Sequence, residues 1–333
     1  MFKHVRTPLV WGAAALLMTL NAMANADSAL PYELRGSDAQ EASLPHMELL
    51  GTLDLSPLRH RYTGVSGLSG LAFDPDQNVL YAVSDSGRLV HFKLTFNSGR
   101  LVGATVVAQH RLKDQTGKRL AGKWADSEGL VAANHKNKVR GDTELLISFE
   151  RHPRVARYTP QGKFLGYEPI ATVLQDIDNY QRPNSALEAM FWDEDHGIVA
   201  SPEFPLDNAE SKEIALYSPR GVVGTLPRLD ETNAAIVALE KLTNGRLVTL
   251  ERAHSWLTLS LKIVLRVTDS PISGKPVRLD GVEVGRLDNA LGWRVDNFEG
   301  LTHHQDNRFF MVSDDNGQPL QKTLLTYFRI NTL

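Results

Sequence analysis

Short apolar runs bounded by turn residues recur along most of the chain. Each run holds three to five aliphatic, aromatic or β-branched residues and follows a turn rich in Asn, Asp or Gly. The runs lie at residues 79–83, 145–147, 198–200, 247–250 and 309–312. Such runs predict hairpin strands. Beyond the N-terminal leader no amphipathic helical pattern of useful length is present, so the pattern predicts an all-β protein.

A three-residue signature precedes each run and gives the period of the chain. It consists of an acid, a small or basic residue, and Leu or Met, with a serine in place of the first acid. The signature starts at Ser69, Glu128, Glu188, Glu240 and Glu299, at intervals of 59, 60, 52 and 59 residues. Five units of about four strands each predict a single β-propeller. A two-sheet sandwich is the alternative, but it does not require a period of this length.

The two ends of the chain complement each other. The last unit runs out at Ile330 after about three strands, whereas residues 47–53 form an apolar segment without a unit of its own. We therefore expect residues 46–55 to pair with residues 324–330 and to close the ring, which leaves no open sheet edge. The propeller domain then spans residues 46–333, and residues 27–45 are expected to be a flexible lead-in. Five repeats are readable, and six blades remain an alternative.

The N-terminus has the three parts of a secretory signal peptide. Lys3 and Arg6 precede an apolar run of 12 residues at 9–20, and the small residues of Ala24-Asn25-Ala26 follow it. A membrane span needs about 20 apolar residues, so this run is too short to be one. We expect residues 1–26 to be removed by cleavage after Ala26. The mature protein is then periplasmic or secreted in a bacterium, without a membrane span.

Composition and missing motifs exclude several classes of function. The chain has no cysteine, which rules out disulfides, a thiolate zinc site and a cysteine nucleophile. Its 36 basic and 39 acidic residues leave a net charge of -3, so the basic surplus of a nucleic-acid binder is absent. Neither a serine-hydrolase elbow nor a His-Glu-x-x-His zinc motif occurs. We expect a monomer that acts on a small anionic or ester substrate.

Two acids per unit stand at the start and the end of the inner hairpin. The innermost strands of a propeller line its axis, so these acids are expected to converge there. Crowded carboxylates raise one another's pKa, and a hard cation with oxygen ligands compensates them; calcium suits such a site. The candidate metal ligands are Asp85, Glu128, Glu150, Glu188, Glu251, Glu299 and Asp314. The alternative, that each carboxylate only accepts hydrogen bonds from its own hairpin, stays open.

Basic residues follow the second acid in two of the units. Arginine binds phosphate or carboxylate with a bidentate fork, which makes these residues candidates for holding an anionic substrate. The candidates are Arg151, His152, Arg252 and His254. An ion pair that only fixes a loop is the alternative for each arginine.

A set of motifs, taken together and in order, resembles one family. The motifs are 67–71, 126–130, 148–151, 184–188, 250–252, 297–301 and 313–316. From about residue 64 to the C-terminus the chain resembles the phytase-like family, described by the esterase-like activity of phytase and found among exported bacterial proteins. The resemblance implies a propeller fold and calcium-assisted hydrolysis of phosphate or other esters. β-Propeller phytases have six blades and a cluster of calcium ions, so no phytase residue is carried over to the five units readable here.

The sequence thus predicts an exported, metal-assisted hydrolase of phosphate or other esters with its site on the propeller axis. Its catalytic residues stay unassigned. Two alternatives remain open at this point. One is a non-catalytic propeller of the bacterial envelope that binds a ligand or a protein, and the other is a lactonase-type propeller enzyme with an axial calcium.

Overall fold

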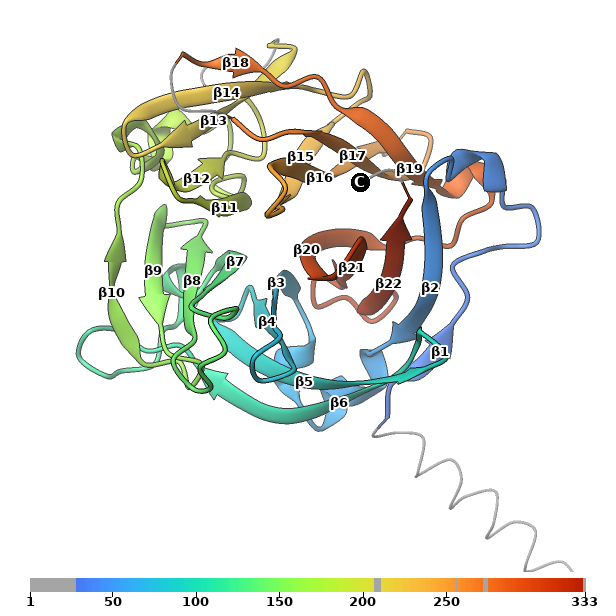
Figure 1. Cartoon of the computed structure of the whole chain (residues 1–333), viewed down its shortest axis with the longest axis horizontal. Coiled ribbons are helices and arrows are strands. Elements are labelled where there is room, and N and C mark those ends of the chain that lie inside the picture. Colours follow the sequence, from blue (N-terminus) through green and yellow to red (C-terminus); the bar gives the residue numbers. More distant parts are fainter. Residues whose placement is uncertain (1–27, 207–210, 256, 272–274, 332–333) are drawn as a thin grey trace, which may run out of the picture.

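The chain forms a ring of five β-sheets around a central axis (Figure 1). The computed structural model describes residues 28–206, 211–255, 257–271 and 275–331, so the expected signal peptide at 1–26 lies outside the described residues. The innermost strands of successive sheets contact one another, and the last of them contacts the first. The fold is therefore the predicted all-β propeller, with five blades and not six.

Three blades follow one another along the first two thirds of the chain. The first contains β3 (Leu68–Asp74), β4 (Val79–Ser84), β5 (Arg88–Asn97) and β6 (Arg100–Arg111). The second contains β7 (Ser127–Ala133), β8 (Glu144–Phe149), β9 (Arg154–Tyr158) and β10 (Phe164–Glu168). The third contains β11 (Ala189–Asp193), β12 (Gly197–Ser201), β13 (Glu213–Ser218) and β14 (Gly221–Pro227).

The last two blades depart from the simple four-strand order. The fourth contains β15 (Ala235–Lys241), β16 (Arg246–Ser255), β17 (Ser260–Asp269) and β19 (Val282–Asp288), while the short β18 (Val277–Arg278) pairs in parallel with β14 of the third blade. The fifth contains β20 (Asn297–Gln305), β21 (Arg308–Asp314) and β22 (Leu324–Ile330), joined by β2 (Met47–Asp54) and β1 (Leu30–Tyr32). Short 3-10 helices connect the strands: η1 (Glu41–Ser43), η2 (Ser56–His60), η3 (Thr63–Val65), η4 (Gly122–Trp124), η5 (Thr172–Leu174), η6 (Ile177–Asn179) and η7 (Asn289–Leu291).

The apolar runs form strands that are buried on both faces. In β8, Leu145 and Ile147 pack with Tyr81 of the first blade, whereas Leu146 between them packs with Ile198 of the third. Successive side chains of a strand point to opposite faces, so a strand between two blades needs apolar residues at every position. This is why the runs are continuous rather than alternating.

The ring is closed by the N-terminal strand, as predicted. β2 pairs antiparallel with β22, from Met47 opposite Ile330 to Asp54 opposite Leu324. Residues 30–45, where we expected a flexible lead-in, contain β1 and η1 in the structure. Leu34, which is only 1% exposed, packs there with Trp293 in the core beside the fifth blade.

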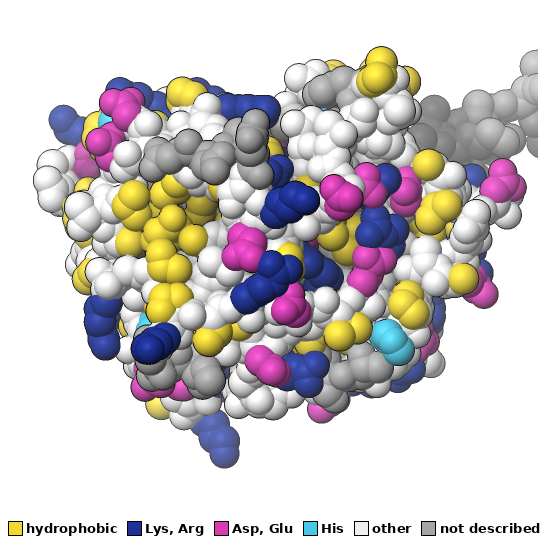
Figure 2. All heavy atoms as spheres, turned by 90° about the horizontal axis from the view of Figure 1, so that it is seen from above, with side chains coloured by type: hydrophobic (Ala, Val, Ile, Leu, Met, Phe, Trp, Pro, Cys, Tyr) yellow, Lys and Arg dark blue, Asp and Glu magenta, His cyan; other side chains and the backbone are white. Residues whose placement is uncertain are grey.

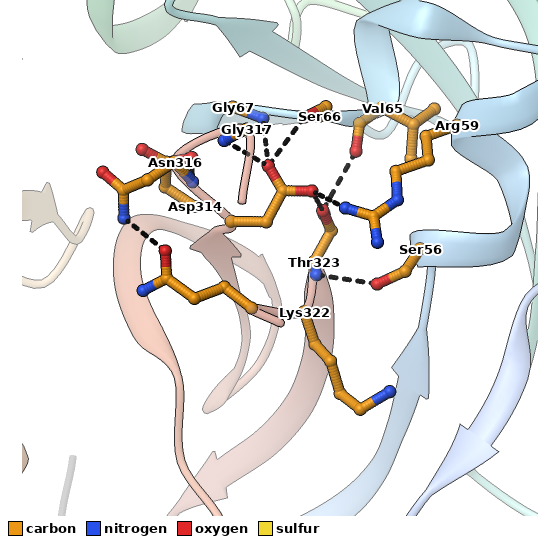
Figure 3. Close-up of polar contacts among 12 residues, drawn as sticks. Ser56, Arg59, Val65, Ser66, Gly67, Asp314, Asn316, Gly317, Lys322 and Thr323 are labelled. Atoms are coloured by element: carbon orange, nitrogen blue, oxygen red, sulfur yellow. Dashed lines mark hydrogen bonds and ion pairs between the residues drawn. The ribbon is translucent and has the colours of Figure 1, made fainter. Parts of the chain in front are cut away.

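A buried carboxylate adds a second link across the closure. Asp315, which is fully buried, follows β21, and one of its oxygens accepts hydrogen bonds from Ser66 Oγ at 2.7 Å and from the backbone N–H of Gly67 at 3.0 Å (Figure 3). Its other oxygen is 2.7 Å from an Arg59 nitrogen and accepts a hydrogen bond from Thr323 Oγ1. The last blade is thereby tied to the segment that enters the first.

The outer side of the ring carries mixed charge. Figure 2 views the ring from the side and shows acidic and basic side chains interleaved across this face. Arg278 of β18, for example, pairs with both Glu213 and Asp280. Among the residues that the structure describes, no helix is long and apolar enough to cross a membrane.

Candidate functional site

An acidic cavity of about 750 Å³ contains the residues that converge on the axis. Eight carboxylates line it, and they come from every blade except the fourth: Asp85, Asp126, Glu128, Glu150, Glu188, Glu203, Glu299 and Asp314. Three arginines, Arg151, Arg182 and Arg252, line it as well. Six of the seven predicted metal ligands therefore face one cavity, and Glu251 does not.

The first set of cavity acids sits at a β-bulge of the innermost strand. Between Phe298 and Gly300 the register of β20 slips by one residue, and the extra residue is Glu299. Three other inner strands have a slip at the corresponding place. It includes Glu128 in β7, whereas the extra residue is Ser69 in β3 and Val237 in β15. A bulge turns an extra side chain out of the regular alternation, and here it lets Glu128 and Glu299 reach the cavity. The sequence signature placed Glu240 at this position of the fourth unit. That placement is wrong, because Glu240 lies near the other end of β15 and Val237 takes the position.

The second set of acids follows the next strand of each blade. The backbone N–H groups of Asp85, Glu150 and Glu203 donate to carbonyl groups of Gly67, Asp126 and Ser185. Asp314 ends β21 at the corresponding place, directly opposite Asn297.

In the fourth blade this second position is held by Arg252 and not by Glu251. Glu251 pairs with Ile236, as Ser313 pairs with Phe298 in the fifth blade, so Arg252 corresponds to Asp314. Neighbouring residues of a strand point to opposite faces, and the shift of one residue turns Glu251 into the blade. There it is 1% exposed, and both of its oxygens lie 2.6 Å from nitrogens of Arg266. Its predicted place on the cavity wall is wrong.

Three carboxylates lie close enough to share one cation. Oxygens of Asp126, Glu128 and Glu150 lie within 4.8 Å of one another. Asp126 was not among the predicted ligands, although it stands two residues before Glu128, a spacing that puts both on one side of an extended chain. Oxygen ligands of this number and charge suit a hard divalent cation such as calcium.

The cavity holds its acids in an environment that opposes their charge. Burial, and then the neighbouring Asp126, raise the pKa of Glu150 to about 8. Burial, followed by Asp126, Asp315 and Glu299, raises the pKa of Asp85 to about 6. For three further carboxyls, burial and the adjacent acids also raise the pKa well above its usual value: Glu128, Glu188 and Asp314. A positive charge in the cavity would relieve this repulsion.

Arg252 supplies such a charge on one side of the cavity. Its Nη2 lies 2.6 Å from Glu203 Oε1, and its Nη1 donates to both Asn297 and Glu299. Burial opposes the charge on Arg252, but Glu299 and Glu203 outweigh it and raise the pKa of the guanidinium. One arginine thus pairs with two of the eight acids. In the described part of the chain, the only ion pair of the cluster of Asp126, Glu128 and Glu150 is the one between Asp126 and Arg151, at 2.6 Å.

Of the two predicted substrate-binding histidines, one lines the cavity and one does not. His254 lines the cavity, two residues after Arg252 and on the same face of β16. His152 does not line it; its ring stacks on Trp124, with centroids 3.7 Å apart. Arg182, in the loop between η6 and β11, lines the cavity although no sequence pattern singled it out. Its only sequence signal is its place two residues before the 184–188 motif.

The fold and the cavity define a five-bladed β-propeller with an acidic site on its axis. The phytase-like family, described as esterase-like activity of phytase, matches residues 63–317. The match spans well over half of the 333 residues, and the chain belongs to this family. No curated protein matches the chain.

Solved structures whose fold resembles that of this chain have low sequence identity to it. A gluconolactonase from Xanthomonas campestris is 13% identical, with a TM-score of 0.40 over 91% of this chain and 97% of that chain. An endo-arabinase from Bacteroides thetaiotaomicron is 12% identical, with a TM-score of 0.45 over 78% of this chain and 93% of that chain. The WD40 domain of Pan2 from Neurospora crassa is 9% identical, with a TM-score of 0.38 over 87% and 97%. At these TM-scores the likenesses carry no inference about function.

Proposed function

We propose that the protein is an exported hydrolase of phosphate or other esters, assisted by a bound divalent cation, with calcium as the preferred ion. The observation that carries the proposal is the cluster of Asp126, Glu128 and Glu150, whose oxygens lie within 4.8 Å of one another in a cavity with an excess of acids. Membership of a family described by esterase-like activity supports the same reaction class.

The donor set fits a hard cation. All of the charged groups in the cluster are carboxylates, and Asp85 and Glu188 line the same cavity as further oxygen donors. When bound, such an ion polarises an ester oxygen and lowers the pKa of a coordinated water. Magnesium requires near-ideal octahedral coordination, whereas calcium accepts oxygen ligands in varied number and arrangement. Calcium is therefore the ion we propose.

The chain's own residues position the other parts of the reaction. Hydrolysis adds water across the ester bond and yields an acid and an alcohol. Arg252 is held rigidly by Glu203 and Glu299, so it presents a fixed donor group beside the acids. His254, on the same face of the strand, lies next to it on the cavity wall. We propose that this side of the cavity receives the substrate and the carboxylate cluster receives the ion.

Calcium titration by calorimetry tests the metal site directly. Chelator-treated protein is expected to bind calcium, and Glu128→Gln or Glu150→Gln is expected to weaken binding at least about tenfold, because each change removes a charged ligand from the cluster. Glu240→Gln is the matched control, since Glu240 lies on the inner strand of the fourth blade but outside the cavity.

Ester hydrolysis tests the reaction class. Release of nitrophenol from p-nitrophenyl phosphate or p-nitrophenyl acetate is expected in calcium, and it is expected to fall with the same two variants. Calcium binding without turnover of any ester would favour the non-catalytic, ligand-binding alternative. No heat on titration with calcium would contradict the metal site, and the acids would then act only within their hairpins.

A further inference from the structure

The cavity has two unlike sides. The first, second and fifth blades supply the acids around the carboxylate cluster. The third and fourth blades add Glu188 and Glu203, but they also present Arg182, Arg252, His254, Leu259 and Leu261. A substrate that enters the cavity therefore meets basic and apolar side chains on this wall, which the other blades do not offer together.

Arg182 differs from the other two arginines of the cavity, because its charge acts on Glu203 from a distance rather than through an ion pair. Arg151 is paired with Asp126, and Arg252 with Glu203 and Glu299. Within the described part of the chain, no carboxylate forms an ion pair with Arg182, whose guanidinium lies 5.2 Å from the ring centroid of Phe204. Stacking on an aromatic face orients a guanidinium and leaves its N–H groups free to bind an anion.

The apolar part of the wall is Leu259 with its neighbour Leu261. Leu259 is 76% exposed and has a φ of 52°, a left-handed conformation that is unfavourable for leucine. The side chain of Asn289 holds this turn: it donates to the carbonyl of Leu259 at 2.9 Å and accepts from the N–H of Leu261 at 3.0 Å. Strained residues that the surroundings hold in place concentrate at ligand sites.

The charge of the cavity restricts the anion that fits. Eight carboxylates face three arginines, and two of these arginines are already paired with cavity acids. A cation in the carboxylate cluster adds two positive charges, which the surrounding acids more than balance. A substrate with many phosphate groups would face uncompensated carboxylates, whereas a single anionic group finds one partner in Arg182.

On the basis of the hydrolase function proposed above, we infer that the substrates are esters with one anionic group beside an apolar alkyl or aryl group. Arg182 binds the anionic group, and Leu259 with Leu261 contacts the apolar group. Polyphosphorylated esters are excluded from the cavity.

Non-hydrolysable probes test this subsite without requiring turnover. The full mature protein in calcium is titrated with phenylphosphonate, methylphosphonate and inositol hexasulfate. Phenylphosphonate is expected to bind about tenfold more tightly than methylphosphonate, because its ring buries apolar surface against the leucines. Inositol hexasulfate is expected to bind most weakly of the three.

Two variants separate the contributions. Arg182→Ala is expected to weaken both phosphonates about tenfold or more, with Arg182→Lys in between. Leu259→Gly is expected to weaken only phenylphosphonate, about threefold to tenfold; glycine also relieves the left-handed backbone, so folding is not at risk. The matched controls are Arg140→Ala, at an exposed site outside the cavity, and Leu257→Gly, on the same turn but outside the cavity lining.

The outcomes are distinct from those of the hydrolase test. Tighter binding of inositol hexasulfate than of phenylphosphonate would overturn the inference, as would unchanged phosphonate affinity in Arg182→Ala or Leu259→Gly. Phosphonate binding as expected, without turnover of any p-nitrophenyl ester, would contradict the hydrolase function and leave the subsite in place. Turnover of inositol hexakisphosphate would support a hydrolase and overturn the inference.

Discussion

Asp314 and Asp315 are neighbours in the sequence with opposite effects on the structure. Asp314 faces the cavity, where burial and then Glu299 raise the pKa of its carboxyl. Asp315 points the other way and is held by Arg59, Ser66 and the N–H of Gly67. The ionised form of Asp314 therefore costs stability in the absence of a cation, whereas the carboxylate of Asp315 accepts hydrogen bonds that tie the last blade to the segment entering the first.

This contrast predicts opposite results for two matched variants. In chelator at pH 8, Asp314→Asn is expected to raise the free energy of unfolding by about 1–3 kcal/mol, because it removes a buried like charge. Asp315→Asn is expected to lower it by about 2–4 kcal/mol, because Arg59 loses a buried partner. Urea denaturation of both variants measures this. Equal destabilisation of both would contradict the assignment of the two side chains.

Glu240 predicts a pH dependence away from the metal site. Burial raises the pKa of this carboxyl to about 7, with Lys136 acting in the opposite direction. Between about pH 4.5 and pH 7 the folded state holds a proton that the unfolded state has lost, so the free energy of unfolding falls as pH rises through this window.

Glu240→Gln is expected to remove that loss. From pH 4.5 to pH 8, the free energy of unfolding of the variant, relative to that of the natural protein, should rise by about 1–3 kcal/mol. Urea denaturation in chelator at both pH values measures the difference, and Glu194→Gln at an exposed position is the control. Parallel stability curves for Glu240→Gln and the natural protein would count against the raised pKa.

The sequence predicted the kinds of residue in the site better than their register. An acid after an apolar run is visible in each unit, but whether it faces the axis depends on a shift of one residue. Glu251 and Arg252 exchange roles through such a shift, and Val237 takes the bulge where the signature suggested Glu240. The register of strand pairing decides which residue faces the axis. That register depends on contacts between strands, which the pattern within one strand does not show. Arg182 was missed for the same reason, because only the folded ring brings its loop to the cavity.

At the scale of elements, the strand that closes the ring should carry a large share of the stability. Leu53 of β2 is 1% exposed in the core between the fifth and first blades. Leu53→Ala is expected to lower the free energy of unfolding by about 2–5 kcal/mol, which is typical of a buried leucine. Thermal or urea denaturation measures this. Glu48→Ala on the same strand, whose partner is the surface residue Arg329, is expected to change it by less than about 1 kcal/mol.

The predicted elements were those with a continuous apolar run. Five inner-hairpin strands and the closing strand appear where the sequence indicated them. β18 was not predicted, because two residues joined in parallel to another blade leave no periodic pattern. β1 and η1 were also missed, since residues 30–45 contain no continuous apolar run. Their order comes from contacts with neighbouring parts of the ring, such as the backbone hydrogen bond from Arg294 to Leu34.

At the scale of the whole molecule, the proposed ion should stabilise the folded ring. The three clustered carboxylates belong to the second blade, and Asp85 of the first blade and Glu188 of the third line the same cavity. An ion that binds only the folded ring adds its binding free energy to the stability. Calcium at 100 times its dissociation constant adds about 2.7 kcal/mol. Chelation is therefore expected to lower the melting temperature by several degrees, and added calcium should restore it. An unchanged melting temperature would contradict the site.

The pairing of β2 with β22 also has a consequence for the order of events during folding. Met47 pairs with Ile330, so the two strands of this seam are far apart in the sequence. The other four blades pair strands that lie much closer together in the chain, whereas one edge of β2 stays unsatisfied until β22 reaches it. Contacts this distant in sequence form slowly. During that interval the same edge can accept β22 from another copy, so crowded expression should favour strand-exchanged dimers.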